Sequence, residues 1–301
     1  MIFYTAVPHL VRDLEDQEKP LIQVVEKTEG LSQVLEAIGK ILATGIPAIN
    51  RALIRHLEVV QRDYMWDFVA KHWEQYSNQS DYIALAYLLA SRLAVSLSGP
   101  GIQQLAQDMG GTVGDAIVAG KVHPMQYYLL PPVEPNPLAG DLYKGKIGEQ
   151  SRYWILLTPS CDMAHNKAEK VLLALCRHIE EFDEYQKWSR SQSLPEPSNT
   201  RRKKLEGLLT DKRRVRDGQP ERYHCLPAAL LVPGLVVDFQ QLITLSRKEL
   251  DTLERIASLD SPFAEALVSR FTRYFGRLGT PDLDTDYVLS QISSKVSGGT
   301  R

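Results

Sequence analysis

The chain has 301 residues, 44% of them hydrophobic and 24% charged, with a formal net charge of −2. These values are ordinary for globular proteins and exclude a general attraction of the whole molecule to nucleic acid or anionic membrane. Three cysteines without a CxxC pair predict a reducing, cytoplasmic environment. No basic and apolar leader opens the sequence, and the most apolar stretch, residues 82–97, contains Arg92 and is shorter than a membrane span. We therefore expect no contact with a membrane.

The first 45 residues alternate between strand and helix patterns. Apolar and β-branched runs at 1–7 and 21–26 predict strands, and apolar spacings at 9–17 and 31–42 predict helices. This order favours parallel strands joined by a crossover helix.

Thr5 and Ala6 end the first predicted strand, and Lys27 ends the second. In these residues the segment resembles the second half of a response-regulator receiver domain, which implies signalling roles for Thr5 and Lys27. Thr28 stands where that family usually has proline, and the half that carries the phosphate-accepting aspartate is not in the sequence. Either that half lies upstream or another chain covers the exposed sheet edge. The alternative is an unrelated fragment in which Thr5 caps and Lys27 is solvated.

Residues 46–120 are predicted to be a helical region. Long helices are expected over 46–76 and 81–97, the second central because it is apolar nearly all round. Trp66 and Trp73 are expected at the core or its edge.

From residue 121 the pattern changes to short strands. Six apolar runs bounded by turn residues predict a small antiparallel barrel or sandwich, with strands at 125–130, 140–144, 153–158, 170–175, 223–226 and 235–245. A charged helical insertion at about 180–219 should project from it, with strands on both sides pairing together. Closing helices are expected at 248–258 and 263–278, and a disordered tail at 281–301.

Gly140-Asp141 and the later run Gly148-Glu149-Gln150-Ser151-Arg152 carry a second resemblance. They resemble the MazF/PemK toxin family, which implies an SH3-like barrel and metal-independent cleavage of single-stranded RNA. Arg152 matches the arginine that acts on the scissile phosphate. A guanidinium at a strand start can hold a phosphate through two hydrogen bonds.

Two positions depart from the family pattern. Tyr153 stands where the family has proline, and Cys176-Arg177-His178 stands where a hydroxyl residue is expected. We therefore expect phosphate binding without toxin-like cleavage. His178 is the residue that could replace the missing group, since imidazole exchanges protons near neutral pH. In an unrelated barrel, Arg152 would only make a surface ion pair.

Cys161 and His165 lie in a chemically dense segment at a strand end. They could form the nucleophile and base of a thiol enzyme. With Asp162 and either His224 or Cys225 they could bind zinc, although the spacing matches no established site. The plainer interpretation is a turn in which Cys161 packs inward. No metal or cofactor is assigned.

Eight basic residues lie within sixteen positions of the insertion and form a candidate nucleic-acid-binding patch. They are Arg201, Arg202, Lys203, Lys204, Lys212, Arg213, Arg214 and Arg216. The alternatives are a solvated, mobile insertion or a docking site for an acidic protein.

Together these patterns predict an α+β chain in four parts. They are a receiver-like fragment (1–45), a helical region (46–120), a MazF/PemK-like barrel with insertion (121–280) and a tail (281–301). The favoured function is non-catalytic regulation in bacterial stress or phage-defence signalling, in which the barrel engages a regulatory protein or RNA. A sequence-selective endoribonuclease using Arg152 and a Cys161/His165 thiol enzyme are the alternatives, and a homo-oligomer is left open.

Overall fold

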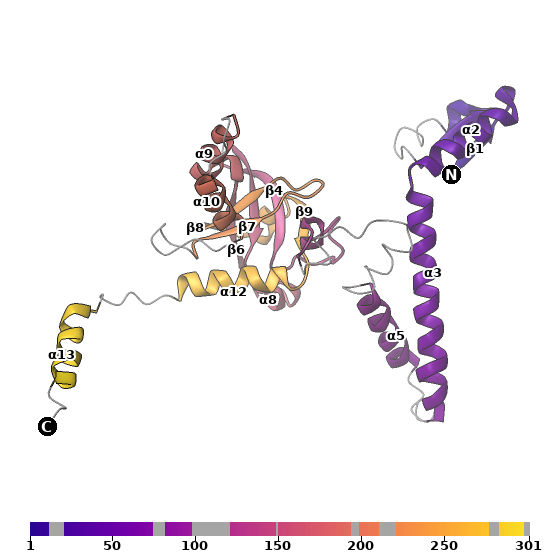
Figure 1. Ribbon diagram of the computed structural model, residues 1–301. Coiled ribbons are helices and arrows are strands. Elements are labelled where there is room, and N and C mark those ends of the chain that lie inside the picture. Colours follow the sequence, from indigo (N-terminus) through magenta and orange to yellow (C-terminus); the bar gives the residue numbers. More distant parts are fainter. Residues whose placement is uncertain are drawn as a thin grey trace. The chain divides into compact units, whose positions relative to one another are not determined.

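The computed structural model describes residues 1–11, 21–74, 82–97, 121–148, 150–193, 199–210, 221–276 and 283–297. The chain forms two compact units, Met1–Val122 and His123–Arg301 (Figure 1). Both contain helices and strands, so the predicted α+β class is confirmed.

The first unit begins with two parallel strands. β1 (Ile2–Thr5) pairs with β2 (Gln23–Glu26) so that Thr5 lies beside Glu26. The short 3-10 helix η1 (Pro8–Leu10) opens the connection, and the rest of the helix predicted at 9–17 lies outside the described residues. A second 3-10 turn, η2 (Lys27–Glu29), leads into α2 (Gly30–Ala43).

The other elements described in this unit are helical. Gly45, with a φ of +75°, separates α2 from α3 (Ile46–Tyr64), which continues through the π-helical turn η3 (Met65–Val69) and the 3-10 turn η4 (Ala70–His72). His56 on α3 lies with its Nε2 3.1 Å from the carbonyl oxygen of Ser96 on α5 (Tyr82–Ser96). No single helix of the described chain is long and apolar enough to cross a membrane; one pair, 27–43 with 46–72, passes by composition and length but is bent by 62°.

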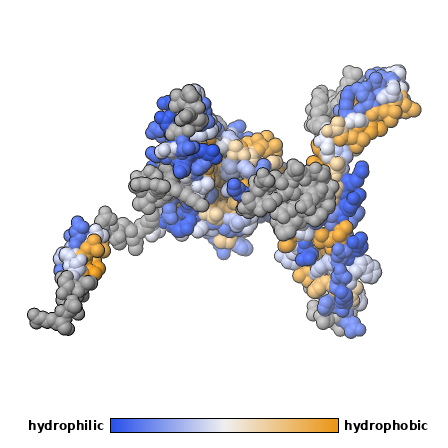
Figure 2. Space-filling model, in the orientation of Figure 1, coloured by the Kyte–Doolittle hydropathy of each residue, from blue (hydrophilic) through white to orange (hydrophobic). Residues whose placement is uncertain are grey.

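The predicted helical core is wrong in one respect. Trp66 is 70% exposed, and Ile83 on the helix predicted to be central is 83% exposed. Apolar residues therefore gather on the surface of this unit (Figure 2). The described elements of this unit, two strands and three α-helices with short helical turns, bury only Ile22, Val25, Ala37 and Val69 among their apolar side chains, because an apolar stripe is buried only where another layer packs on it.

The second unit is built on a seven-stranded antiparallel sheet in the order β3-β9-β4-β5-β6-β8-β7. The strands are β3 (Tyr128–Leu129), β4 (Asp141–Ile147), β5 (Gln150–Leu156), β6 (Lys170–His178), β7 (Tyr223–Leu226), β8 (Leu235–Ser246) and β9 (Glu254–Leu259). β6 and β8 pair from Lys170↔Ser246 to His178↔Leu235, which confirms the predicted pairing across the insertion.

The sheet does not form the closed barrel that the sequence predicts. Its ladders leave β3 and β7 as edge strands. The two edges nevertheless approach each other, because the Tyr128 hydroxyl donates a 2.7 Å hydrogen bond to the carbonyl oxygen of Pro227, just after β7. Apolar clusters cover both faces, with Ile155, Val237 and Phe239 in one and Leu156, Leu173 and Leu250 in the other.

Helices surround this sheet. η5 (Pro124–Tyr127) precedes β3, and α8 (Ser160–Ala164) connects β5 to β6. After β6 come η6 (Ile179–Glu181), α9 (Asp183–Ser191) and α10 (Asn199–Leu209), which form the predicted insertion. The predicted closing helix at 263–278 is α12 (Phe263–Phe275), whose Leu267 is fully buried and whose Phe271 ring packs against Phe239.

Two predicted elements are corrected. The helix expected at 248–258 is a single turn, α11 (Arg247–Leu250), followed by β9, which lies between β3 and β4. The tail expected to be disordered contains α13 (Thr285–Ser297), where Asp284 accepts a hydrogen bond from the Tyr287 N–H and so caps the first turn.

A buried ion pair at the β7–β8 edge yields a stability prediction. Asp238 is fully buried and accepts hydrogen bonds from Arg222 Nε at 2.7 Å and Nη2 at 2.6 Å, and from the Gln240 N–H at 3.0 Å. Burial alone raises the pKa of Asp238, but these hydrogen bonds outweigh it, and its pKa lies below its ordinary value.

The Asp238 carboxylate should therefore stabilise the fold above about pH 4, where an unfolded aspartate is ionised, and lose that effect as the pH falls through its lowered folded pKa. We expect Asp238→Asn to be less stable than wild type at pH 7 and to flatten the loss of stability between pH 5 and 3. Urea unfolding between pH 5 and 3 measures the unfolding free energy of each variant, and Asp251→Asn, at an exposed position, is the control. Parallel pH profiles for Asp238→Asn and wild type would contradict the assignment.

Candidate RNA phosphate site

A pocket of about 240 Å³ opens where β5 begins and β6 ends. The residues that line it are Ser151, Arg152, Tyr153, Cys176, His178 and Glu181. Two of them, Arg152 and His178, are the pair that the sequence suggested for phosphate chemistry.

Strand pairing brings these residues together. β5 and β6 run antiparallel, and their last paired positions at this end are Tyr153 and Cys176. Beyond that pair the two strands separate, so the pocket opens between Arg152 on one side and His178 on the other. The His178 ring packs edge-on against the Tyr153 ring, with centroids 5.4 Å apart, which fixes the position of the imidazole.

Glu181 closes one side of the pocket and has its carboxylate fully engaged. It accepts hydrogen bonds from Arg177 Nε at 3.1 Å and from the His178 backbone N–H at 3.3 Å. The Arg177 guanidinium also lies 4.6 Å from the centre of the Phe182 ring. Glu181 and Arg177 therefore anchor the turn that carries His178, and their charges are balanced against each other.

Two further charged groups border the imidazole and the ring beneath it. Glu180 Oε2 lies 4.0 Å from His178 Nδ1, which is too far for a hydrogen bond. The Lys144 ammonium lies 5.8 Å from the centre of the Tyr153 ring. Lys144 and Arg152 thus add positive charge at the mouth of the pocket, which suits an anionic ligand.

Cys176 lines the pocket but is not suited to nucleophilic chemistry. The residue is 2% exposed, and burial raises the pKa of its thiol, so it stays protonated. The chemistry available is therefore the phosphate-binding capacity of Arg152, proton exchange at His178 and the hydroxyls of Ser151 and Tyr153. The sequence suggested neither hydroxyl; their only signal is position, since both flank Arg152 where the strand starts.

The other predicted catalytic pair is not joined. Cys161 lies on α8 and His165 follows its last turn, and no hydrogen bond between their side chains is found in this described segment. Cys161 is exposed rather than packed inward, and its Sγ lies 3.7 Å from Asp162 Oδ1. Within the described ranges no group of three His, Cys, Asp or Glu side chains could hold a metal, while His224 and Cys225 are buried in β7.

The remaining predicted residues lie elsewhere. Arg201, Arg202, Lys203 and Lys204 are exposed on α10, whereas Lys212, Arg213, Arg214 and Arg216 lie outside the described residues. In the first unit, Thr5 Oγ1 accepts a hydrogen bond from the Val7 N–H, and the Lys27 carbonyl accepts one from the Tyr4 hydroxyl. The receiver-like role of Thr5 and Lys27 stays a prediction.

Comparison with known proteins gives a weak structural similarity. No protein-family model matches the chain, and no curated protein sequence is detectably similar to it. A solved structure described as an endoribonuclease in complex with its cognate antitoxin from Mycobacterial species is similar at a TM-score of 0.29 and 12% identity. The match covers 48% of this chain and 99% of that one.

Proposed function

We propose that the second unit binds single-stranded RNA at the β5–β6 pocket and cleaves it without a metal ion. The observation that carries the proposal is that Arg152 and His178, which are 26 positions apart in the sequence, line the same pocket. A guanidinium and an imidazole facing one cavity are the two groups that phosphate-ester cleavage by an internal nucleophile most needs.

The reaction uses the ribose of the substrate as its nucleophile. The 2′-oxygen attacks the adjacent phosphorus and loses its proton to water, because the pocket is open to solvent. The bond from phosphorus to the 5′-oxygen of the next nucleotide breaks, and His178 gives that oxygen a proton. The products are a 2′,3′-cyclic phosphate and a free 5′-hydroxyl, and solvent returns the proton to His178.

Arg152 binds the phosphate throughout this reaction. Its contribution is largest in the transition state, where negative charge builds up on the non-bridging oxygens. Ser151 and Tyr153, which flank it, are placed to hold the sugar and phosphate in register. No cofactor is needed for these steps.

The decisive test is the chemistry of the cut ends. Incubated with a long mixed-sequence RNA in EDTA, the protein should leave 2′,3′-cyclic phosphate and 5′-hydroxyl ends, and it should not cut the same sequence made with 2′-deoxyribose. Arg152→Ala should lower the rate about 10²- to 10³-fold, and Arg152→Lys should restore part of it. End-group mapping and initial rates measure both.

Equal cleavage by Arg152→Ala would contradict the site. One observation favours a second function, namely RNA binding without cleavage: among the described residues that line the pocket the only imidazole is that of His178, and Glu181 is already engaged by Arg177. If RNA binds to the wild-type chain, binds more weakly to Arg152→Ala and is cut by neither, this second function is established. A non-catalytic role is also the one that the sequence favoured.

A further inference from the structure

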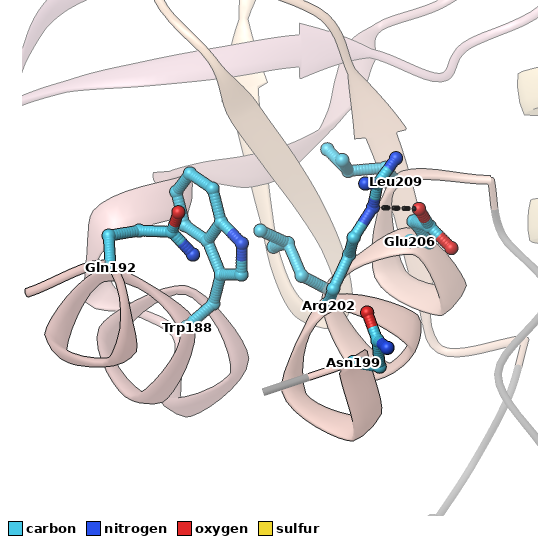
Figure 3. Close-up of a pocket in the computed structure, with 7 residues that line it drawn as sticks. Trp188, Gln192, Asn199, Arg202, Glu206 and Leu209 are labelled. Atoms are coloured by element: carbon cyan, nitrogen blue, oxygen red, sulfur yellow. Dashed lines mark hydrogen bonds and ion pairs between the residues drawn. The ribbon is translucent and has the colours of Figure 1, made fainter. Parts of the chain in front are cut away.

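A second, larger hollow lies between α9 and α10, in the insertion that leaves the sheet after β6 and returns at β7 (Figure 3). Its volume is about 610 Å³. Trp188 and Gln192 line it from α9, and Figure 3 shows the indole ring of Trp188 standing between the two helices. The main residues opposite are Asn199, Arg202, Leu205 and Glu206 of α10.

The lining suits a flat, polar-edged ring. The half-buried indole of Trp188 offers a stacking face, and buried Leu205 provides an apolar floor. Gln192 and Asn199 each carry an amide, which presents a donor and an acceptor side by side, as the edges of nucleobases do. An aromatic platform combined with such amides is the pattern by which proteins hold unpaired bases.

The charges around the groove indicate which class of ligand it binds. The four consecutive cations Arg201–Lys204 are exposed on α10. Among the described lining residues the carboxylate is that of Glu206, which accepts a hydrogen bond from Arg202 Nε at 2.8 Å. Arg202 therefore lies at the groove within a run of cations that leaves the α10 surface beside it net positive, which favours a phosphate-bearing ligand over a purely apolar helix.

We propose that this groove is a nucleobase subsite for the single-stranded RNA that the β5–β6 pocket acts on, in which one base stacks on Trp188 while Arg202 binds a flanking phosphate. The inference rests on the proposed function. Asp183, where α9 begins, follows His178 by five positions, and α9 rises about 1.5 Å per residue, so Trp188 lies within roughly 25 Å of His178. One RNA of several nucleotides can reach both.

The test measures binding on the full chain carrying His178→Ala, so that no probe is cut. The probes are a labelled oligouridine and an abasic ribose-phosphate chain of the same length and charge. We expect the oligouridine to bind more tightly by about 5- to 100-fold, the range for loss of one base stack. Trp188→Leu should erase that preference, and circular dichroism would confirm that the variant is folded.

A matched pair of arginines tests the role of Arg202. Arg202→Gln should weaken binding of both probes and lower the slope of log affinity against log salt by about one. Arg190→Gln is the control, because Arg190 is exposed and two positions from Trp188 on α9, about 200° around the helix. It should change neither quantity.

The outcomes distinguish a failure of the groove proposal from a failure of the proposed function on which it rests. If Trp188→Leu in the wild-type background still cleaves RNA and the preference for oligouridine over the abasic chain is unchanged, the groove proposal is wrong. The proposal for the β5–β6 pocket then stands. An effect of Arg190→Gln as large as that of Arg202→Gln would also overturn the groove. Failure of the full chain to bind RNA at low salt, or preferential binding of a polyglutamate peptide, would overturn both.

Discussion

Replacing His178 with alanine should lower the rate of RNA cleavage by about 10²- to 10⁴-fold, the usual contribution of a positioned proton donor or acceptor. RNA affinity should change much less, because Arg152 supplies the permanent charge that binds the phosphate in the pocket. Initial rates under saturating RNA, together with binding measured on an uncut 2′-deoxy analogue, separate the two effects.

His165→Ala is the matched control for this experiment. His165 is also an exposed histidine that follows a helix of the same unit, but it does not line the pocket. A large effect of His165→Ala with none of His178→Ala would move the chemistry to the α8 segment and revive the thiol interpretation with Cys161. Loss of cleavage and of binding together in His178→Ala would show that the ring only supports the pocket.

The part of the fold that the sequence predicts best is the segment that carries this site. The runs around Leu142, Ile155 and Leu173 are short, apolar and bounded by turn residues, and all three lie in neighbouring strands of the sheet. Arg152 could be singled out because a resemblance placed it at a strand start. The meeting of Arg152 with His178 could not be derived from spacing, since it depends on the register Tyr153↔Cys176.

The failures have identifiable physical causes. In β9 and the turn before it, Leu250, Leu253 and Ala257 recur at three and four positions, so the spacing imitates a helix, while the structure buries them from a turn and a strand. Periodicity indicates which residues are buried, but it does not show whether a helix or a strand carries them. The exposed Trp66 and Ile83 show the converse, since an apolar stripe indicates a buried face only where another layer covers it.

The Trp188 groove illustrates a third limit. The sequence marks the insertion as charged and helical, and it shows few aromatic residues near the basic run. Trp188 lies fourteen positions before Arg202, and it joins that residue in one groove only because α9 and α10 pack against each other. The packing of two helices thus brings together residues that are far apart in the sequence.

Replacing Arg255 with methionine should cost about 3–5 kcal/mol of unfolding free energy, the range for leaving one partner of a buried ion pair alone. Asp141 is fully buried and forms an ion pair with Arg255, whose Nε lies 2.7 Å from Asp141 Oδ2 and whose Nη2 donates a hydrogen bond to Oδ1 at 3.2 Å. The carboxylate also accepts hydrogen bonds from the Ser258 hydroxyl at 2.6 Å and the Leu138 N–H at 2.7 Å. For a unit of this size the melting temperature should fall by roughly 10 °C. Denaturant unfolding and calorimetry give both values.

The pH dependence of the loss in unfolding free energy tests whether the unpaired Asp141 carboxylate causes it. Burial already raises the pKa of Asp141 above its ordinary value, against the opposing effects of Ser258, Leu138 and Arg255. Without Arg255 that pKa should rise further, so the deficit of Arg255→Met should be greatest at neutral pH and shrink as the pH falls and Asp141 takes up a proton. Adding Asp141→Asn should recover part of the loss at neutral pH, because the buried charge is then absent.

Arg273→Met is the control for loss of an arginine as such. Its guanidinium lies 4.0 Å from Glu221, and its side chain is 61% exposed, so the change should stay within about 0.5 kcal/mol. Equal losses for Arg255→Met and Arg273→Met would show that burial of Asp141 is not the source of the effect. A deficit of Arg255→Met that does not vary with pH would instead assign it to lost packing and to the hydrogen bond from Arg255 Nη1 to the Glu134 carbonyl oxygen.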